Sequence, residues 1–346
     1  MKRKVLSLLL CALLIAGLTF GCANKKAPPL KDTFFEIADS VSKLEEIGFD
    51  ASLSMSIPTD SESNYTSFMG DITDAKLSIS GSSSKFFNQF ACEIVATVRG
   101  SQGESTLKVT DILFDDSGLY INLRTLFNLL SLSQGIGGPY DALINSDYLG
   151  ITPEDLSAFT GMPLSNLQDK ENLPKNQELN NHMLKVFRDS LKAENFKEEG
   201  GIYTLTLNSS DLAEIAKAFA SDVETNAGIY ADALLETAAV SPGYLAILGL
   251  EKENPSRDEV IAFVKEKAAE LSSDLAQDTS IGTSSLLISL GKGKADKSYD
   301  IRVSLTAPEE DIDIKADISL AEVGTEKITP PTDYVKFDDF LSIFLM

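Results

Sequence analysis

The stretch Phe-Asp-Ala-Ser-Leu-Ser-Met-Ser-Ile, residues 49–57, alternates apolar and polar side chains without interruption. Successive side chains of a β-strand point to opposite faces of the sheet, so this period of two predicts a strand with one apolar and one solvated face. Such strands are typical of antiparallel sheets, because parallel sheets are usually covered on both faces. The stretch therefore predicts an antiparallel sheet with one face that needs a cover.

Eight other stretches show the same alternation, so nine strands of this kind are predicted. The eight lie at residues 75–79, 90–98, 107–114, 119–123, 202–207, 286–290, 301–305 and 312–320. Asp115-Asp116-Ser117-Gly118 has the residue types of a tight turn and predicts a hairpin. A similar order, Glu198-Glu199-Gly200-Gly201, precedes the strand at 202–207, which leaves open an internal repeat of two similar halves.

Longer segments between and before these strands have the apolar spacing or the start signals of helices. They lie at residues 32–47, 177–193, 210–237 and from a Ser-x-x-Glu capping box at 256–259 onward. Gly48 is expected to end the first helix. Only the helices between residues 123 and 277 carry enough apolar surface to cover the sheet. We therefore expect a single α+β domain over residues 32–346, in which a large curved antiparallel sheet, a half-barrel, is wrapped around helices.

The N-terminus has the organisation of an export signal. Three cations at residues 2–4 precede an apolar run at 5–20 and then Gly21-Cys22, which predicts a signal peptide over residues 1–21. Thr19-Phe20-Gly21-Cys22 resembles the lipobox of bacterial lipoproteins, in which the cysteine thiol takes a diacylglycerol. The resemblance implies that a lipid on Cys22 anchors the protein to a bacterial membrane, in the cell envelope and outside the cytoplasm. Residues 22–31 are expected to form a flexible tether.

The chain is strongly acidic, with 30 Lys and Arg against 52 Asp and Glu and a net charge of −22. Without residues 1–21, which hold three cations and no acid, the net charge is −25. A field of this sign repels the phosphates of nucleic acids and anionic lipid headgroups. We therefore expect no nucleic-acid partner, and the lipid on Cys22 is the predicted contact with the membrane.

The residue types that usually carry catalysis are scarce. His182 is the only histidine, and the chain has no Gly-x-Ser-x-Gly segment. Of the three cysteines, Cys11 leaves with the signal and Cys22 takes the lipid, so Cys92 is expected to be a buried, inert thiol. One histidine and one thiol do not make a zinc site. We therefore predict no catalytic activity, no metal and no cofactor.

The segment 227–250 is unusually apolar and rich in small residues. It is expected either as a packed core layer or as part of the lining of a hydrophobic cavity between helices and sheet. The residues predicted to line such a cavity are Leu234, Leu235, Tyr244, Leu245, Leu248, Leu286, Ile288, Val303 and Ile314.

The lipobox-like residues, the one-sided strands at 49–123, the helical insert and the closing strands at 286–320 together resemble the LolA- and LprG-like lipoproteins of bacterial envelopes. In those proteins an incomplete antiparallel barrel cups helices and can hold acyl chains. The resemblance implies a carrier or sensor that binds a lipid or another hydrophobic ligand, and Cys22 is the one functional residue that carries over. The alternative is a cell-surface protein-interaction or structural module without a ligand, for which the sequence identifies no protein partner.

Overall fold

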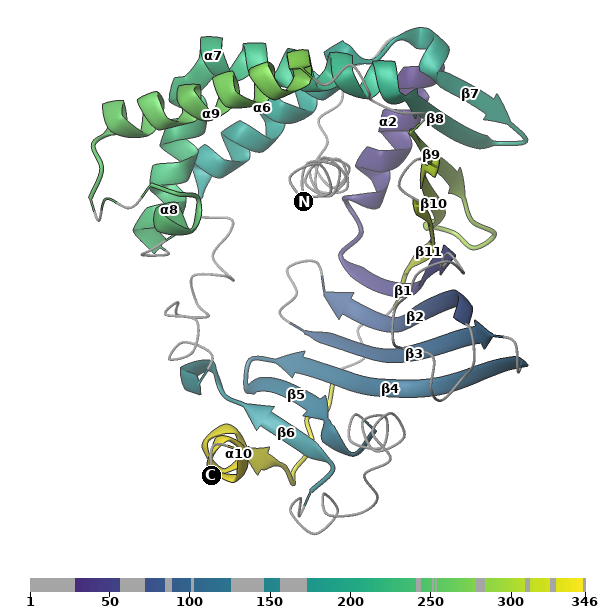
Figure 1. Cartoon of the computed structure of the whole chain (residues 1–346). Coiled ribbons are helices and arrows are strands. Elements are labelled where there is room, and N and C mark those ends of the chain that lie inside the picture. Colours follow the sequence, from purple (N-terminus) through teal and green to yellow (C-terminus); the bar gives the residue numbers. More distant parts are fainter. Residues whose placement is uncertain are drawn as a thin grey trace. The chain divides into compact units, whose positions relative to one another are not determined.

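Figure 1 shows a computed structural model of the chain. The structure describes residues 29–56, 72–84, 89–100, 103–125, 146–155, 173–240, 244–250, 252, 254–277, 284–308, 312–323 and 328–344. The expected signal peptide, Cys22 and the expected tether up to residue 28 lie outside these ranges. The description of the fold that follows concerns the residues within them.

The helices alternate with strands along the chain. The helices are α2 (Leu30–Val41), α6 (Pro174–Ser190), the short 3-10 helix η3 (Ala193–Asn195), α7 (Ser209–Val240), α8 (Tyr244–Ile247), α9 (Arg257–Gln277) and α10 (Phe337–Phe344). The strands are β1 (Glu46–Ser56), β2 (Ile72–Ser84), β3 (Phe90–Gly100), β4 (Gly103–Asp115), β5 (Gly118–Asn122), β6 (Tyr148–Ile151), β7 (Phe196–Glu199), β8 (Ile202–Asn208), β9 (Ser285–Lys292), β10 (Ser298–Ala307), β11 (Ile312–Glu322) and β12 (Val335–Lys336).

These strands belong to one open, mostly antiparallel sheet in the order β12-β6-β5-β4-β3-β2-β1-β11-β10-β9-β8-β7. The predicted class, α+β with a large antiparallel sheet, is confirmed, and each of the nine predicted strands is present. Three short strands, β6, β7 and β12, were not predicted, and β12 pairs with β6 in parallel. Strands of two to four residues are too short for an alternating pattern to reveal them.

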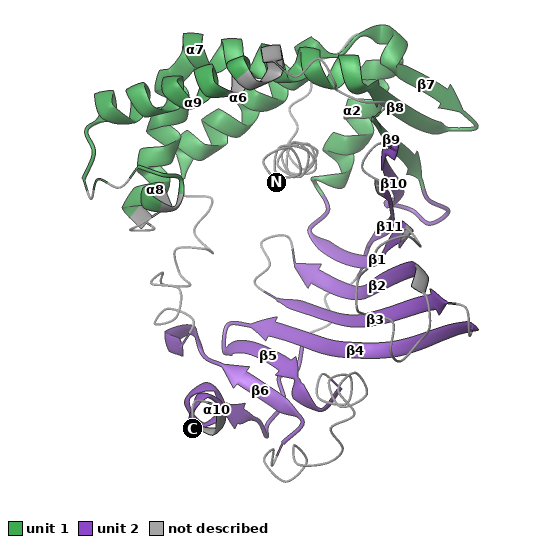
Figure 2. Ribbon diagram, in the orientation of Figure 1, with its two compact units in different colours: residues 1–43, 165–292 green, residues 44–164, 293–346 purple. Residues whose placement is uncertain are grey.

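Contacts divide the chain into two compact units, coloured separately in Figure 2. The first unit comprises residues 1–43 and 165–292, and the second comprises residues 44–164 and 293–346. Each unit is built from two separate stretches of sequence, so neither corresponds to a continuous half of the chain.

An aromatic core holds α2 against β7, β8 and β9 in the first unit. Phe34 of α2 lies edge-on to Phe196 of β7, with 5.5 Å between the ring centroids, and Phe35 meets Phe187 of α6 at 6.3 Å. Edge-to-face pairs of this kind add to the gain from burying the rings. Helix α2 therefore supplies part of the cover that the sequence had assigned to the later helices.

An ion pair ties α2 to α6 beside this core. Arg188 of α6 donates a hydrogen bond to the buried Asp39 of α2 at 2.9 Å, and its guanidinium carbon lies 4.2 Å from the centre of the Phe35 ring. Asp39 carries a charge into a mostly apolar setting, so its partner is needed to offset the loss of hydration.

The first unit also contains a layer of helices in which α7 packs against α6 and α9. Helix α7 is kinked at Asn226, whose φ of −112° and ψ of 24° are not helical. The carboxylate of Glu236, near the end of α7, accepts hydrogen bonds from the backbone N–H groups of Lys175 and Asn176 at 3.1 and 2.8 Å. These groups have no partner within α6, so Glu236 caps the start of that helix.

The predicted helix at 32–47 ends earlier than expected. Helix α2 stops at Val41 and β1 begins at Glu46. Ile47 and Gly48 pair with β11, so Gly48 is a strand residue and does not end the helix. The prediction was wrong at this point because pairing with a strand far along the sequence outweighs the local spacing of apolar residues.

The two turns with similar sequences differ in their geometry. Asp115 pairs with Gly118 in the hairpin of β4 and β5, whereas Glu199 pairs with Ile202 in the hairpin of β7 and β8. Because Asp115 corresponds to Glu198 in the sequence, the two turns are offset by one residue. The similarity in sequence does not extend to the register of the hairpins.

Candidate ligand-binding surface

The long strands of the second unit place apolar residues in line across the sheet. Directly paired residues of antiparallel strands point to the same face, so a set of paired apolar residues forms a continuous row. Four rows cross β10, β11, β1, β2 and β3 in this way, and we call them together the apolar face. The rows are Leu305-Ile314-Met55-Ala75-Val98, Val303-Ala316-Leu53-Leu77-Ala96, Ile301-Ile318-Ala51-Ile79-Ile94 and Tyr299-Leu320-Phe49-Gly81-Cys92. No side chain in these rows is charged.

The apolar face is closed at one end and open at the other. At the closed end the ring of Phe49 stacks on that of Phe90, with 5.8 Å between centroids and 13° between planes, and Cys92 is buried. At the open end Leu53 and Met55 are 45 % and 46 % exposed, while most other members of the face are half-buried. Contiguous apolar surface that is left exposed marks a binding surface more often than an isolated apolar residue does.

The opposite face of the same strands carries charged side chains. Arg302 of β10 donates a hydrogen bond to Asp317 of β11 at 2.6 Å. Lys108 of β4 lies 2.7 Å from carboxylate oxygens of both Asp111 and Glu93, and its hydrogen bonds to Asp111 and Glu93 raise the pKa of the ammonium group. Exposed ion pairs contribute little to stability, so the main consequence of these charges is that this face is solvated.

The predicted cavity residues on the strands fall into two groups. Val303 and Ile314 lie on the apolar face, on the adjacent strands β10 and β11. Leu286 and Ile288 lie on β9 in the first unit, where they are 3 % and 1 % exposed. The structure therefore brings Val303 and Ile314 into the candidate surface and places the other two in the core of the first unit.

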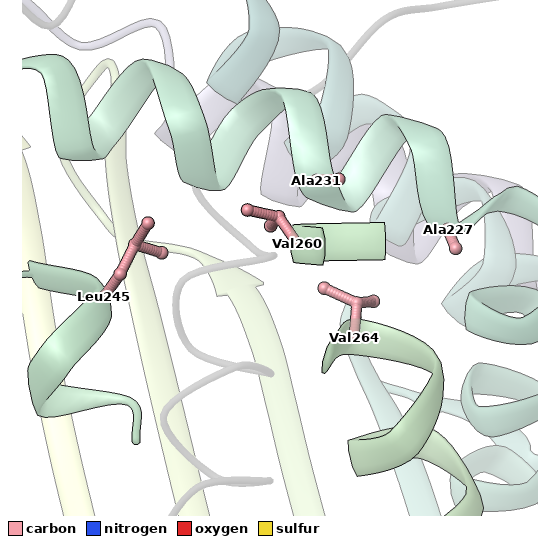
Figure 3. Close-up of a cluster of buried hydrophobic side chains, with 5 residues drawn as sticks. All are labelled: Ala227, Ala231, Leu245, Val260 and Val264. Carbon is pink, nitrogen blue, oxygen red and sulfur yellow. The ribbon is translucent and has the colours of Figure 1, made fainter. Parts of the chain in front are cut away.

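The predicted cavity residues on the helices belong to the first unit. Leu245 of α8 is buried in a cluster with Ala227 and Ala231 of α7 and Val260 and Val264 of α9, shown in Figure 3. Partly buried residues that pack against this cluster include Leu234 and Leu235. Leu248 is 40 % exposed, and the side chain of Tyr244 lies outside the described part of the structure. Direct contacts among these residues are what a packed core layer requires, the first of the two alternatives that the sequence left open.

The predicted site did not include Leu53 and Met55, the most exposed members of the apolar face. Their alternation with serines correctly predicted the strand. The exposure of a strand face depends on which elements cover it, and no local pattern carries that information. The signal that could have found them is the pairing of 49–57 with two other one-sided strands.

His182 of α6 belongs to a polar cluster in the first unit. Its Nε2 atom lies 2.7 Å from Oδ2 of Asp222 on α7, which also accepts a hydrogen bond from the hydroxyl of Tyr230 at 2.9 Å. Asn226, at the kink of α7, donates to the other oxygen of Asp222 at 2.8 Å. Burial and the hydrogen bond to Asp222 raise the pKa of Tyr230. The described partners of His182 are thus a carboxylate and an aromatic ring, not a nucleophile that a histidine base could activate.

Metal and membrane sites were sought among the described residues. Within these ranges, no three or more His, Cys, Asp or Glu side chains are grouped so that they could hold a metal ion. In the same part of the chain, no helix has both the length and the apolar character needed to cross a membrane.

Comparison with known proteins gives no family for this chain. No protein-family model matches it, and no curated protein is significantly similar to it. The function is therefore argued from the apolar face itself.

Proposed function

We propose that the protein is a lipid-anchored extracytoplasmic lipoprotein that binds an acyl chain, or an equally elongated apolar ligand, on the apolar face. The observation that carries the proposal is the open end of this face, where Leu53 and Met55 are 45 % and 46 % exposed within uncharged rows. The signal-like N-terminus and the lipobox-like residues before Cys22 support the placement in the cell envelope.

The chemistry of the surface favours an acyl chain over a protein partner. An acyl chain has no polar groups that need hydrogen-bond partners, so a face without charged side chains can bury it at no polar cost. A protein partner would bring backbone and side-chain polar groups to the same surface. A second copy of this chain is disfavoured further, because two molecules of net charge −25 each would repel one another. The resemblance to LolA- and LprG-like lipoproteins points to the same ligand class.

The strength of such binding can be bounded from the hydrophobic effect. Each methylene that leaves water contributes about 0.8 kcal/mol. Burial of about ten methylenes would then supply about 8 kcal/mol, which corresponds to a dissociation constant on the order of 1 µM. The cost of ordering the chain weakens this value. Saturable binding in the micromolar range is therefore the expected behaviour.

A fluorescent fatty acid tests the proposal directly. The full chain with Cys22→Ser, which cannot take the lipid, is titrated with palmitic acid carrying a nitrobenzoxadiazole group. We expect saturable binding, and we expect the double variant Leu53→Gln/Met55→Gln to bind at least tenfold more weakly. Because both side chains are already nearly half exposed, the variant should keep the melting temperature of its parent.

The control is Ile202→Gln, which changes an equally exposed aliphatic residue on β8 of the first unit, 48 % exposed. This variant should bind the probe as its parent does. Binding that does not saturate, or that is the same in all three proteins, would contradict the proposal. In that case the interaction module without a ligand becomes the better account of the exposed face.

A further inference from the structure

The C-terminal segment contacts the second unit at two widely separated strands. Val323, just after β11, lies at Gly48 of β1, where an added Cβ would come within 2.7 Å of its Cγ1 atom. Tyr334, just before β12, lies at Gly150 of β6, where an added Cβ would come within 2.2 Å of its ring. Four strands, β2 to β5, separate β1 from β6 in the sheet.

Both contacts are on the face opposite to the apolar face. Gly48 and Gly150 are the ends of one cross-strand row, Gly48-Ser82-Ala91-Leu113-Tyr120-Gly150. This row alternates along each strand with the row that contains Phe49 and Cys92, so it points to the charged side. Tyr334 is fixed there by an edge-to-face contact with Tyr120, 5.3 Å between centroids.

The chain then passes around the edge of the sheet and onto the other face. Val335 pairs with Leu149 in the short parallel ladder between β12 and β6, and α10 follows at once. Phe337 and Phe340 of α10 pack against Leu149 and Leu123, as the position of α10 beside β6 in Figure 1 illustrates.

Leu149 extends one row of the apolar face towards the edge of the sheet. It pairs with Ile121, Ile121 pairs with Ile112, and Ile112 pairs with Cys92 of that row. Helix α10 therefore covers the β5–β6 end of the same surface whose β1–β2 part leaves Leu53 and Met55 exposed.

The contacts that hold α10 in place are few. The ladder of β12 has two residues, and the buried members of the cluster under α10 are Leu123 and Leu149. A helix of eight residues is much too short to be stable in isolation, so α10 depends on this docking. Elements with little buried apolar surface open at a low free-energy cost.

We propose that α10 is a lid on the apolar face, hinged at β12, which yields when a long acyl chain reaches the β5–β6 end. Tyr334 stays in contact with Gly150 and Tyr120 and keeps the lid attached to the edge of the sheet. A short chain fits on the part of the face near Leu53 and leaves α10 docked. The inference rests on the proposed function, since it concerns access to the same surface.

The test compares long and short acyl probes on the full chain with Cys22→Ser. The variant Phe337→Ser/Phe340→Ser removes the two side chains that dock α10. It should bind labelled palmitic acid about tenfold more tightly than its parent, because no lid has to be displaced, and should bind labelled octanoic acid with unchanged affinity. Ser342→Ala, on the exposed side of α10, is the matched control and should change neither affinity.

A second measurement needs no variant at the lid. Hydrogen–deuterium exchange of the α10 amides should become faster when palmitic acid is added and should stay the same with octanoic acid. Failure of both probes to bind saturably would refute the proposed function itself. If palmitic acid binds while α10 exchange and the affinity of the variant are unchanged, or if the variant binds it more weakly, the lid is refuted and the binding surface stands.

Discussion

The ring of Tyr334 lies so close to Gly150 that a Cβ atom at position 150 would come within 2.2 Å of ring atom Cδ2. The absence of a side chain at Gly150 is what lets the C-terminal segment lie against β6. The same ring contacts Tyr120, and the hydroxyl of Ser146 donates to the carbonyl of Asp333 at 2.7 Å beside it. The edge of the sheet and the C-terminus are thus fitted to one another at a single residue.

Gly150→Ala should destabilise the protein by about 1–3 kcal/mol, the usual cost of overpacking, and chemical denaturation would measure it. Combining it with Tyr334→Ala should recover part of the loss, because the clash is removed with the ring. Gly291→Ala is the control, since the nearest atom to an added Cβ there is 3.4 Å away. Equal effects of the two alanines would show that the contact with Tyr334 does not matter.

Leu245→Arg should unfold the helical layer of the first unit. Leu245 is 5 % exposed within a cluster of aliphatic residues, and an unpaired charge there would cost several kcal/mol. Leu248→Arg, three residues later and 40 % exposed, should fold normally. Circular dichroism and thermal unfolding of the two variants provide the comparison. A Leu245→Arg protein that keeps its melting temperature would favour a cavity at this position over a packed core.

The cap at the start of α9 should give a defined acid dependence. Hydrogen bonds from Lys252 and from the backbone and hydroxyl of Ser256 lower the pKa of Glu259 from 4.5 to about 2. A lowered pKa means that the ionised form stabilises the folded state. This contribution is complete above pH 4.5 and is lost as the pH falls through about 2.

The melting temperatures of the parent and of Glu259→Gln should therefore differ at pH 6 and converge as the pH approaches 2. Glu266→Gln, at an exposed position of the same helix, is the control and should show no such convergence. A constant difference between the parent and Glu259→Gln across this range would contradict the assigned capping role.

Cys22→Ser should abolish the attachment of the protein to membranes. The parent is expected to partition into detergent, and its intact mass should exceed that of the polypeptide beginning at Cys22 by the mass of its acyl groups. The variant should lack this added mass. An acylated Cys22→Ser protein that still fractionates with membranes would overturn the assignment of the anchor.

Alternation predicted nine strands correctly, because each has one face in water and one face against apolar neighbours. It could not reveal β6, β7 and β12, which are held by partners far along the chain. The docking of Phe337 on Leu149, for example, joins residues that are almost two hundred positions apart. No local pattern encodes such a contact.

The candidate site was harder to predict than the fold. The apolar composition of 227–250 is equally compatible with a core and with a cavity lining, and in the structure Leu245 packs directly on neighbouring helices. The exposed positions Leu53 and Met55 lie in a stretch whose alternation was plain. Their exposure is a property of the assembled second unit, where the end of the face near Met55 is left open.

The most direct test of the account is native mass spectrometry of the full chain with Cys22→Ser, purified from a bacterial host without detergent. The account predicts a co-purified lipid with at least one acyl chain, bound in a fixed ratio to the protein and reduced or lost in Leu53→Gln/Met55→Gln. Protein that carries no lipid, and that acquires none at a saturable site when acyl chains are added, would contradict the central claim.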